Sequence, residues 1–151
     1  MTDIINFNKN KTNKLQDVSM NIEERLAILS ADVRKKAYAP YSNFKVGASI
    51  LSDVGIHVGA NVENASYGCG VCAEASAISA MIAEGGKKIK LICVSGESKH
   101  PVPPCGNCRQ KIREFAEPDT QILIVNEKAE LQIDMPFEKL LPMSFGPDFL
   151  K

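Results

Sequence analysis

The sequence has no tryptophan, only two histidines and no net charge, because 18 basic side chains balance 18 acidic ones. Proteins that bind nucleic acids normally carry a basic stripe that neutralises phosphates, and single-strand binders add aromatic side chains on which bases stack. Only 6% of the residues are aromatic. The nearest basic run, Lys9, Lys11 and Lys14, is typical of a solvated tail. We therefore expect no nucleic-acid partner.

Long apolar runs are also missing. No stretch approaches the ~20 residues that cross a bilayer, and the first residues show neither an apolar signal core nor a cleavage site. We therefore expect no membrane partner and a cytoplasmic location. In a reducing compartment, five cysteines are better explained by metal binding or chemistry than by disulfides.

Length and patterning favour one α/β domain. Residues 1–19 are polar and predict a flexible N-terminal tail, whereas residues 20–151 are expected to form a single domain. Asn21 and Glu24 are placed to form a capping box at the first helix. The periodicity predicts helices over 22–38, 72–84, 105–117 and 136–140, and strands over 45–50, 56–60, 89–94, 121–125 and 131–133. This alternation favours a sheet covered on both faces by helices.

The chemical signal is Cys-Ala-Glu at 72–74 followed by Pro-Cys-Gly-Asn-Cys at 104–108. Cys105 and Cys108 are three residues apart at a predicted helix start, so both sulfurs can reach one metal ion. Cys72 begins another helix and can supply a third ligand. A catalytic zinc uses three protein ligands and keeps one open position. Glu74, two residues after Cys72, would then lie beside that position and move protons.

A structural zinc site is the main alternative. Cys69 and Cys72 form a second Cys-x-x-Cys pair, and four thiolates would close the metal site. The separation of the two pairs exceeds the ~15–20 residues usual for such pairs, which favours the catalytic interpretation without excluding the other. Cys93, in an apolar predicted strand, is expected to be a core residue.

The same residues resemble the zinc-dependent nucleoside and base deaminases in their three-cysteine form. Further segments resemble the small cytidine deaminases within that family, and they are residues 38–48, 59–67, 104–110 and 140–145. The resemblance implies a three-layer α/β/α fold with a mixed five-stranded sheet. It also implies one zinc ion per subunit, a homotetramer, and hydrolytic deamination of free cytidine and deoxycytidine.

The resemblance further implies residue roles. Zinc would be held by Cys72, Cys105 and Cys108, and Glu74 would be the proton shuttle. Asn61 and Glu63 would bind the ribose hydroxyls, Phe44 would pack on the pyrimidine, and the backbone at Ala73 would read the base edge. Tyr67 and Phe145 would complete the site of a neighbouring subunit.

One departure from the family pattern concerns charge. Cytidine deaminases of this type commonly carry Arg after the catalytic Glu, where this chain has Ala75. We hypothesise that Arg109, beside Cys108, offsets part of the thiolate charge. Two enzymatic alternatives remain open: a deaminase of another aminopyrimidine, such as a nucleoside antibiotic, would not need Asn61 and Glu63, and a polynucleotide deaminase would need the basic groove that is missing.

Overall fold

A mixed five-stranded sheet forms the centre of the computed structural model, which describes residues 20–150; the expected N-terminal tail, residues 1–19, lies outside the described residues. The strand order is β2-β1-β3-β4-β5, in which β3 and β4 are parallel and every other neighbouring pair is antiparallel. The strands are β1 (Val46–Ser52), β2 (Ile56–Ala60), β3 (Ile89–Gly96), β4 (Ala116–Val125) and β5 (Leu131–Pro136).

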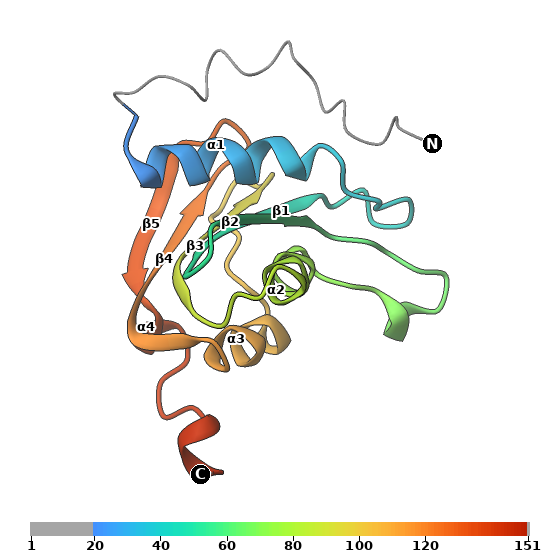
Figure 1. Cartoon of the computed structure of the whole chain (residues 1–151). Coiled ribbons are helices and arrows are strands. Elements are labelled where there is room, and N and C mark those ends of the chain that lie inside the picture. The colour runs from blue at the N-terminus through green and yellow to red at the C-terminus, as the bar shows by residue number, and fades with distance from the viewer. Residues whose placement is uncertain (1–19, 151) are drawn as a thin grey trace, which may run out of the picture.

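Helices cover both faces of this sheet (Figure 1), as the alternation of elements predicted. Helix α1 (Ile22–Arg34) lies on one face, and α2, α3 and α4 lie on the other. The bounds of the last three are α2 (Ala73–Ala83), α3 (Gly106–Arg113) and α4 (Phe137–Leu140). The fold is therefore the expected three-layer α/β/α arrangement. No helix in the described part of the chain is long and apolar enough to cross a membrane.

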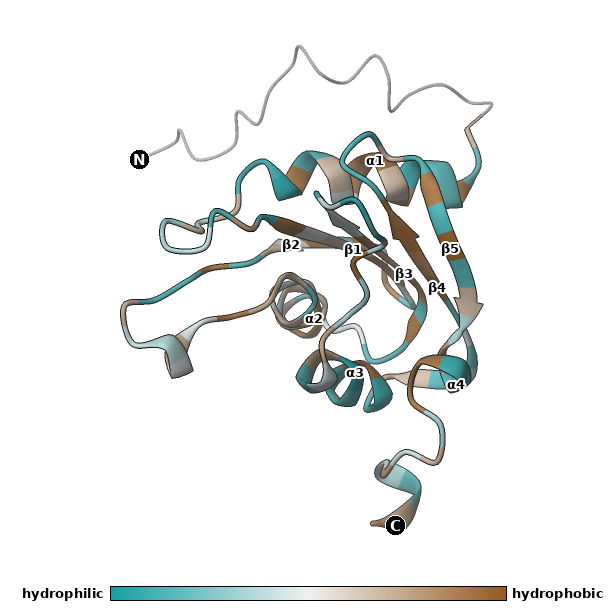
Figure 2. Cartoon of the chain, turned by 180° about the vertical axis from the view of Figure 1, so that it is seen from behind, coloured by the Kyte–Doolittle hydropathy of each residue, from teal (hydrophilic) through white to brown (hydrophobic). Residues whose placement is uncertain are grey.

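The two faces of the sheet bury separate apolar clusters, because successive side chains of a strand point to opposite sides. On β3, Ile92 and Val94 join the cluster under α2, α3 and α4, whereas Leu91 and Cys93 join the cluster under α1. Figure 2 shows the largely hydrophobic strands β3 and β4 between α1 and α3, in which hydrophilic residues are frequent. Cys93 is a core residue, as predicted, and burial raises the pKa of its thiol to about 11.

Two glycines let helices approach the sheet closely from opposite sides. A Cβ at Gly47 of β1 would lie 2.1 Å from the Ser30 carbonyl oxygen of α1. A Cβ at Gly59 of β2 would lie 2.3 Å from the backbone nitrogen of Ala77 in α2. Any side chain at Gly59 would therefore push α2, and the residues at its start, away from the sheet.

Two helices end earlier than predicted. The predicted capping box of Asn21 and Glu24 is present, but α1 ends at Arg34 because the chain turns to pair Tyr38 with residues 61–63. Similarly, α3 ends at Arg113, since Ala116 already pairs with Ile89 and begins β4. Both endings reflect hydrogen bonds to distant residues that local periodicity does not report.

Two segments project from the body of the molecule (Figure 1). The first, residues 61–71, includes a short 3-10 turn, η1 (Tyr67–Cys69), in which Tyr67 is 83% exposed. The second, residues 141–150, ends in η2 (Pro147–Phe149) and carries Phe145, which is 57% exposed and stacks on Phe149. We call these the arm and the C-terminal segment.

Candidate metal and active site

Two helix starts bring three cysteines together on one side of the sheet. Cys72 is the N-cap residue of α2 and Cys105 that of α3, both with extended backbone and neither with a side-chain capping hydrogen bond. Cys108 lies in the first turn of α3 and is fully buried. The three Sγ atoms lie within 4.8 Å of one another, and those of Cys72 and Cys105 are 3.9 Å apart.

This cluster fits one zinc ion per subunit, because catalytic zinc is held by three protein ligands and thiolates are among those it prefers. Cys72 and Cys105 stand at helix starts, where backbone N–H groups without intrahelical partners and the positive end of the helix dipole favour thiolates. Cys69, exposed in η1, does not join the three thiols. The four-cysteine alternative is therefore not formed among residues 20–150.

The thiols differ in how readily they ionise without metal. Burial raises the pKa of the Cys108 thiol, and the nearby Glu74 carboxylate raises it further. Burial likewise raises the pKa of Cys72. At Cys105, partial burial is outweighed by hydrogen bonds from the Cys108 backbone and from both other thiols, so its pKa is lowered. Cys105 is thus the thiol that most easily becomes a thiolate.

Glu74 places a carboxyl group against the cysteine cluster. It lies in the first turn of α2, is only 4% exposed, and its Oε2 accepts a hydrogen bond from the Cys108 thiol at 3.4 Å. Burial raises its pKa, against the opposing effects of its own backbone N–H, the Cys108 thiol and the charge of Lys111. A buried carboxyl beside a metal-binding cluster is suited to proton transfer.

The position after Glu74 is filled by Ala75, which is buried, so no cation is present there. Arg109 was the expected replacement, but its guanidinium donates to the carbonyl oxygens of Pro104 and Leu140, both at 2.9 Å, and not to a thiol. The charge hypothesis for Arg109 therefore gains no support from its contacts.

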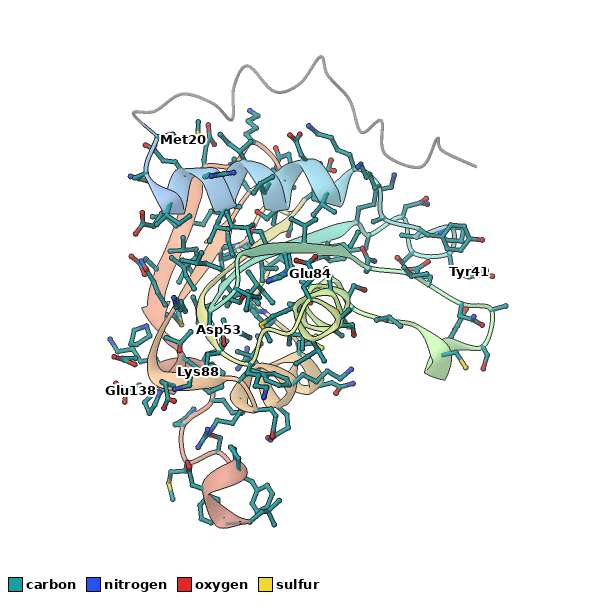
Figure 3. All side chains as sticks on the ribbon, viewed as in Figure 1. Met20, Tyr41, Asp53, Glu84, Lys88 and Glu138 are labelled. Carbon is teal, nitrogen blue, oxygen red and sulfur yellow. The ribbon has the colours of Figure 1, made fainter. Side chains whose placement is uncertain are left out.

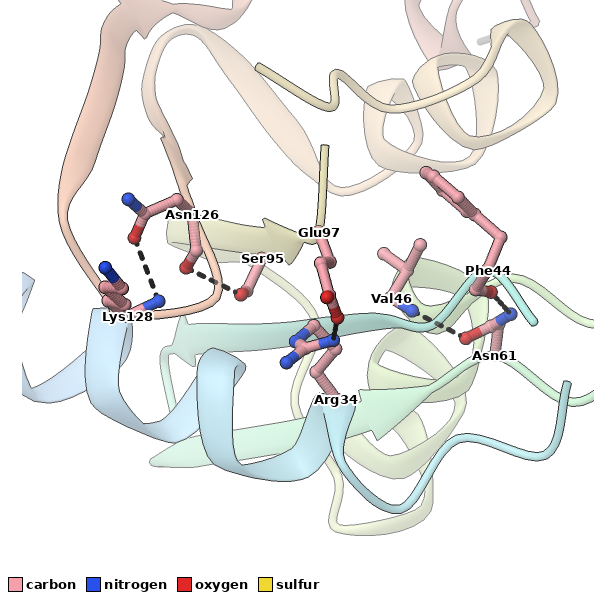
Figure 4. Close-up of polar contacts among 8 residues, drawn as sticks. All are labelled: Arg34, Phe44, Val46, Asn61, Ser95, Glu97, Asn126 and Lys128. Atoms are coloured by element: carbon pink, nitrogen blue, oxygen red, sulfur yellow. Dashed lines mark hydrogen bonds and ion pairs between the residues drawn. The ribbon is translucent and has the colours of Figure 1, made fainter. Parts of the chain in front are cut away.

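Asn61 braces the segment that carries Phe44 (Figure 4). Its side-chain nitrogen donates to the Phe44 carbonyl oxygen at 2.9 Å, and its side-chain oxygen accepts from the Val46 backbone N–H at 2.8 Å. The Phe44 side chain is 43% exposed, so its ring is available to a ligand. Asn61 thus ties the start of β1 to the end of β2.

Glu63 holds the neighbouring residues in the same way. Its carboxylate accepts hydrogen bonds from the backbone N–H groups of Tyr41 and Ser42 and from the Ser42 hydroxyl. The Ser42 hydroxyl, followed by the Tyr41 N–H, lowers the pKa of Glu63. Ser42 was missed by sequence reasoning; its place in a Pro-Tyr-Ser-Asn turn, two residues before Phe44, was the available signal.

A cavity of about 370 Å³ opens between residues 41–42, just before Phe44, and the arm. Its lining consists of Tyr41, Ser42, Glu63, Asn64, Tyr67 and Gly70. Figure 3 labels Tyr41 at this end of the molecule and Asp53 and Lys88 at the other. Ala73 is fully buried and begins α2 beside Cys72, whereas Tyr67 and Phe145 lie on the two separate projections.

Comparisons with known proteins agree with this geometry. The family model "Cytidine and deoxycytidylate deaminase zinc-binding region" matches residues 20–124. The cytidine deaminase of Halalkalibacterium halodurans is 42% identical over 113 residues, which cover 74% of this chain and 85% of that protein. The cytidine deaminase of Sporosarcina psychrophila is 37% identical over 128 residues, covering 84% and 93%.

Solved structures give the same result. The crystal structure of cytidine deaminase from Burkholderia pseudomallei superimposes with a TM-score of 0.76 at 39% identity, covering 83% of this chain and 100% of that one. The cytidine deaminase from Mycobacterium leprae superimposes with a TM-score of 0.70 at 35% identity, covering 82% and 100%. The fold and the three-cysteine site place this chain in the class of zinc-binding deaminases. Within that class, the chain belongs to the cytidine and deoxycytidylate deaminase family.

Proposed function

We propose that this protein is a cytidine deaminase, which hydrolyses the 4-amino group of cytidine and deoxycytidine to give uridine or deoxyuridine and ammonia, as in pyrimidine salvage. The observation that carries the proposal is the buried Glu74 carboxyl, 3.4 Å from the Cys108 thiol, beside three converging cysteines. Relatives and solved structures that bear the name cytidine deaminase support the choice of substrate.

The proposed metal ligands are Cys72, Cys105 and Cys108, whose thiols lie within 4.8 Å of one another. When bound, zinc supplies the Lewis acidity that makes water a nucleophile near neutral pH. Their placement at two helix starts favours the thiolate forms that metal binding requires. Because Glu74 lies in the first turn of α2, its carboxyl and the Cys72 thiol are presented by the same helix.

Glu74 performs the proton transfers in the proposed reaction. It takes one proton from the attacking water and gives it to ring N3, while the water oxygen forms a bond to C4. Glu74 then takes the second proton of that oxygen and gives it to the amino group. The C4–N bond breaks, ammonia leaves, and the C4 carbonyl of uridine remains. The reaction consumes one water molecule and no other co-reactant.

Substrate recognition is proposed for the residues around the Phe44 segment. Phe44 packs against the pyrimidine ring, Asn61 and Glu63 bind the ribose hydroxyls, and the backbone at Ala73 contacts the base edge. The hydrogen bonds of Asn61 and Glu63 support this assignment. Both side chains hold the backbone of residues 41–46, from which Phe44 projects, so both lie close to that residue. Ribose binding and ring stacking would then depend on the same hydrogen bonds.

We also propose a homotetramer in which Tyr67 and Phe145 complete the site of a neighbouring subunit. Their exposure on the two projections supports this, because large apolar side chains gathered on a protruding segment are typical of interfaces. Light scattering coupled to size exclusion would give the mass, and a monomer at working concentration would contradict the proposal.

Residues 20–151 are proposed as one domain, and the free thiols support a cytoplasmic location.

The function is tested by following the ultraviolet absorbance of cytidine and deoxycytidine with purified, zinc-loaded protein. Conversion to uridine and deoxyuridine that stops after zinc removal and returns with added zinc is expected. Free cytosine is the matched control, because it lacks the ribose that Asn61 and Glu63 are proposed to bind. A folded, zinc-loaded protein that converts neither nucleoside would contradict the proposal, and deamination of a modified aminopyrimidine alone would support the other deaminase class.

A further inference from the structure

The chain that leads to Cys105 has little regular structure of its own. Residues 97–105 connect the end of β3 to the start of α3 outside any helix or strand. At its beginning, Glu97 pairs with Arg34 of α1 at 2.9 Å (Figure 4). At its end, the connection runs into Pro104, whose side chain is fully buried. Cys105 therefore follows an irregular connection, and the residue directly before it is buried.

Arg109 supplies contacts on both sides of Cys105. Its backbone N–H donates to the Cys105 carbonyl oxygen at 2.9 Å, which closes the first turn of α3. Its side chain folds back, and Nε donates to the Pro104 carbonyl oxygen at 2.9 Å. Arg109 thus donates hydrogen bonds to the carbonyl oxygen of the residue before Cys105 and to that of Cys105 itself.

The Arg109 side chain is itself anchored by a third contact. Its Nη1 donates at 2.9 Å to the carbonyl oxygen of Leu140, the last residue of α4. Carbonyl groups at the end of a helix lack intrahelical partners, so a guanidinium is a favourable partner there. The anchored guanidinium thus restrains the Pro104–Cys105 peptide, whose nitrogen is bonded directly to the Cα atom that carries the Cys105 thiol side chain.

We propose that Arg109 is a positioning residue that holds Cys105 in place for the metal ion. The inference rests on the proposed function only in taking Cys105 as a zinc ligand. It differs from a charge-compensating role, because both guanidinium contacts are with carbonyl oxygens. Lysine cannot reproduce it fully, since one ammonium group lacks the planar fork that reaches two acceptors in fixed directions.

The test is the rate at which zinc-loaded protein loses zinc to a colorimetric chelator, compared for wild type, Arg109→Gln and Arg109→Lys. Arg113→Gln is the matched control. Arg113 lies on the same helix and donates to Ser144 and Asp148 of the C-terminal segment, so its variant loses side-chain hydrogen bonds of α3 that do not involve Pro104 or Leu140. The absorption bands of the cobalt-substituted proteins report the ligand geometry independently.

Removal of a residue that orients a metal ligand typically costs 10–100-fold in metal affinity or activity, so Arg109→Gln is expected to release zinc about tenfold faster or more. Arg113→Gln, which loses a surface ion pair, should stay within about twofold of wild type. Arg109→Lys should fall between them. The cobalt spectrum should change in Arg109→Gln and not in Arg113→Gln.

Zinc release by Arg109→Gln at the wild-type rate would overturn the proposal, as would equal acceleration in Arg113→Gln. If Arg109→Gln does not fold, Arg109→Lys carries the test, and wild-type zinc release by that variant would count against a positioning role. No substrate is present in these measurements. Failure of the protein to deaminate cytidine would therefore not affect this result, and a wild-type release rate would leave the proposed function intact.

Discussion

Helices α2 and α3 present cysteines to the same cluster by different means. Each begins with a cysteine N-cap in extended backbone. Helix α2 is rich in Ala, Ile and Met, is buried over much of its surface and packs on Gly59. Helix α3 is short and polar, and only Cys108 and Ile112 are buried within it. Packing fixes the first helix, whereas hydrogen bonds from Arg109 fix the start of the second.

One metal site can therefore depend on two kinds of interaction that are lost through different substitutions. Packing is sensitive to added volume, and a hydrogen-bonded brace is sensitive to lost donors. Helix α2 also carries Glu74, so it contributes chemistry as well as a ligand, whereas α3 contributes Cys105 and Cys108. Variants of the two helices should therefore separate metal retention from turnover.

The largest effect is expected for Glu74→Gln on α2. General acid–base residues contribute about 10²–10⁴-fold to the reaction rate. Turnover of Glu74→Gln should therefore fall by a factor of about 10² or more, while its zinc content stays at the wild-type level. Activity is measured with cytidine and zinc by elemental analysis. Ser79→Ala, on the same helix, removes only a bond to the Ala75 carbonyl and serves as the control. Full activity in Glu74→Gln would remove the chemical distinction between the helices.

Gly59→Ala tests the packing of α2. The added Cβ would lie 2.3 Å from the Ala77 backbone nitrogen, and overpacking of this kind typically costs about 1–3 kcal/mol in unfolding free energy. Urea unfolding measures the loss. Gly68→Ala is the control, because a Cβ there meets no atom within 4 Å. Equal stability of the two variants would show that α2 is not held by its close approach to β2.

A smaller effect concerns the far end of α2, where Asp53 accepts hydrogen bonds from the backbone N–H groups of Lys87 and Lys88. The Lys87 bond is the main cause that lowers the Asp53 pKa from 3.8. The carboxylate therefore stabilises the fold above its unfolded pKa, and this stabilisation is lost as pH falls through the folded value.

The corresponding variant is Asp53→Asn, which removes the charge that makes the lowered pKa stabilising. It should be less stable than wild type near pH 7. The difference should begin to shrink as the pH falls below about 4, where the unfolded carboxyl gains a proton, and should disappear below the lower pKa of the folded state. Urea unfolding across this range measures it, with exposed Asp119→Asn as the control. A stability difference that does not depend on pH would mean that the negative charge of Asp53 does not strengthen its hydrogen bonds to Lys87 and Lys88.

The smallest effect is expected for Cys69→Ser. Its thiol is exposed and lies outside the cysteine cluster, so zinc content and turnover should match wild type. Loss of zinc from this variant would revive the four-cysteine site, and it would make the arm a third element that presents a ligand. Elemental analysis of the purified variant is sufficient to distinguish these outcomes.

Much of the architecture could be predicted from the sequence because it rests on local patterns. The helix that begins with Cys72, the strands of the sheet and the pairing of Cys105 with Cys108 all follow from periodicity and short spacings. The brace formed by Ser42 and Glu63 could not be predicted, since it joins residues 21 positions apart through side-chain geometry. The carbonyl contacts of Arg109 depend likewise on α4, which lies 31 residues further along the chain.

Gly47 and Gly59 have a consequence for how the family varies. Gly47 pairs with Ala60 and Gly59 with Ala48, so the two glycines lie on neighbouring residue pairs while helices press on them from opposite faces. Neither residue is proposed to touch the nucleoside, yet no larger side chain fits at either position. Selection should therefore keep both glycines through changes of substrate, and an engineer who seeks new specificity has more freedom at the cavity residues Tyr41 and Asn64.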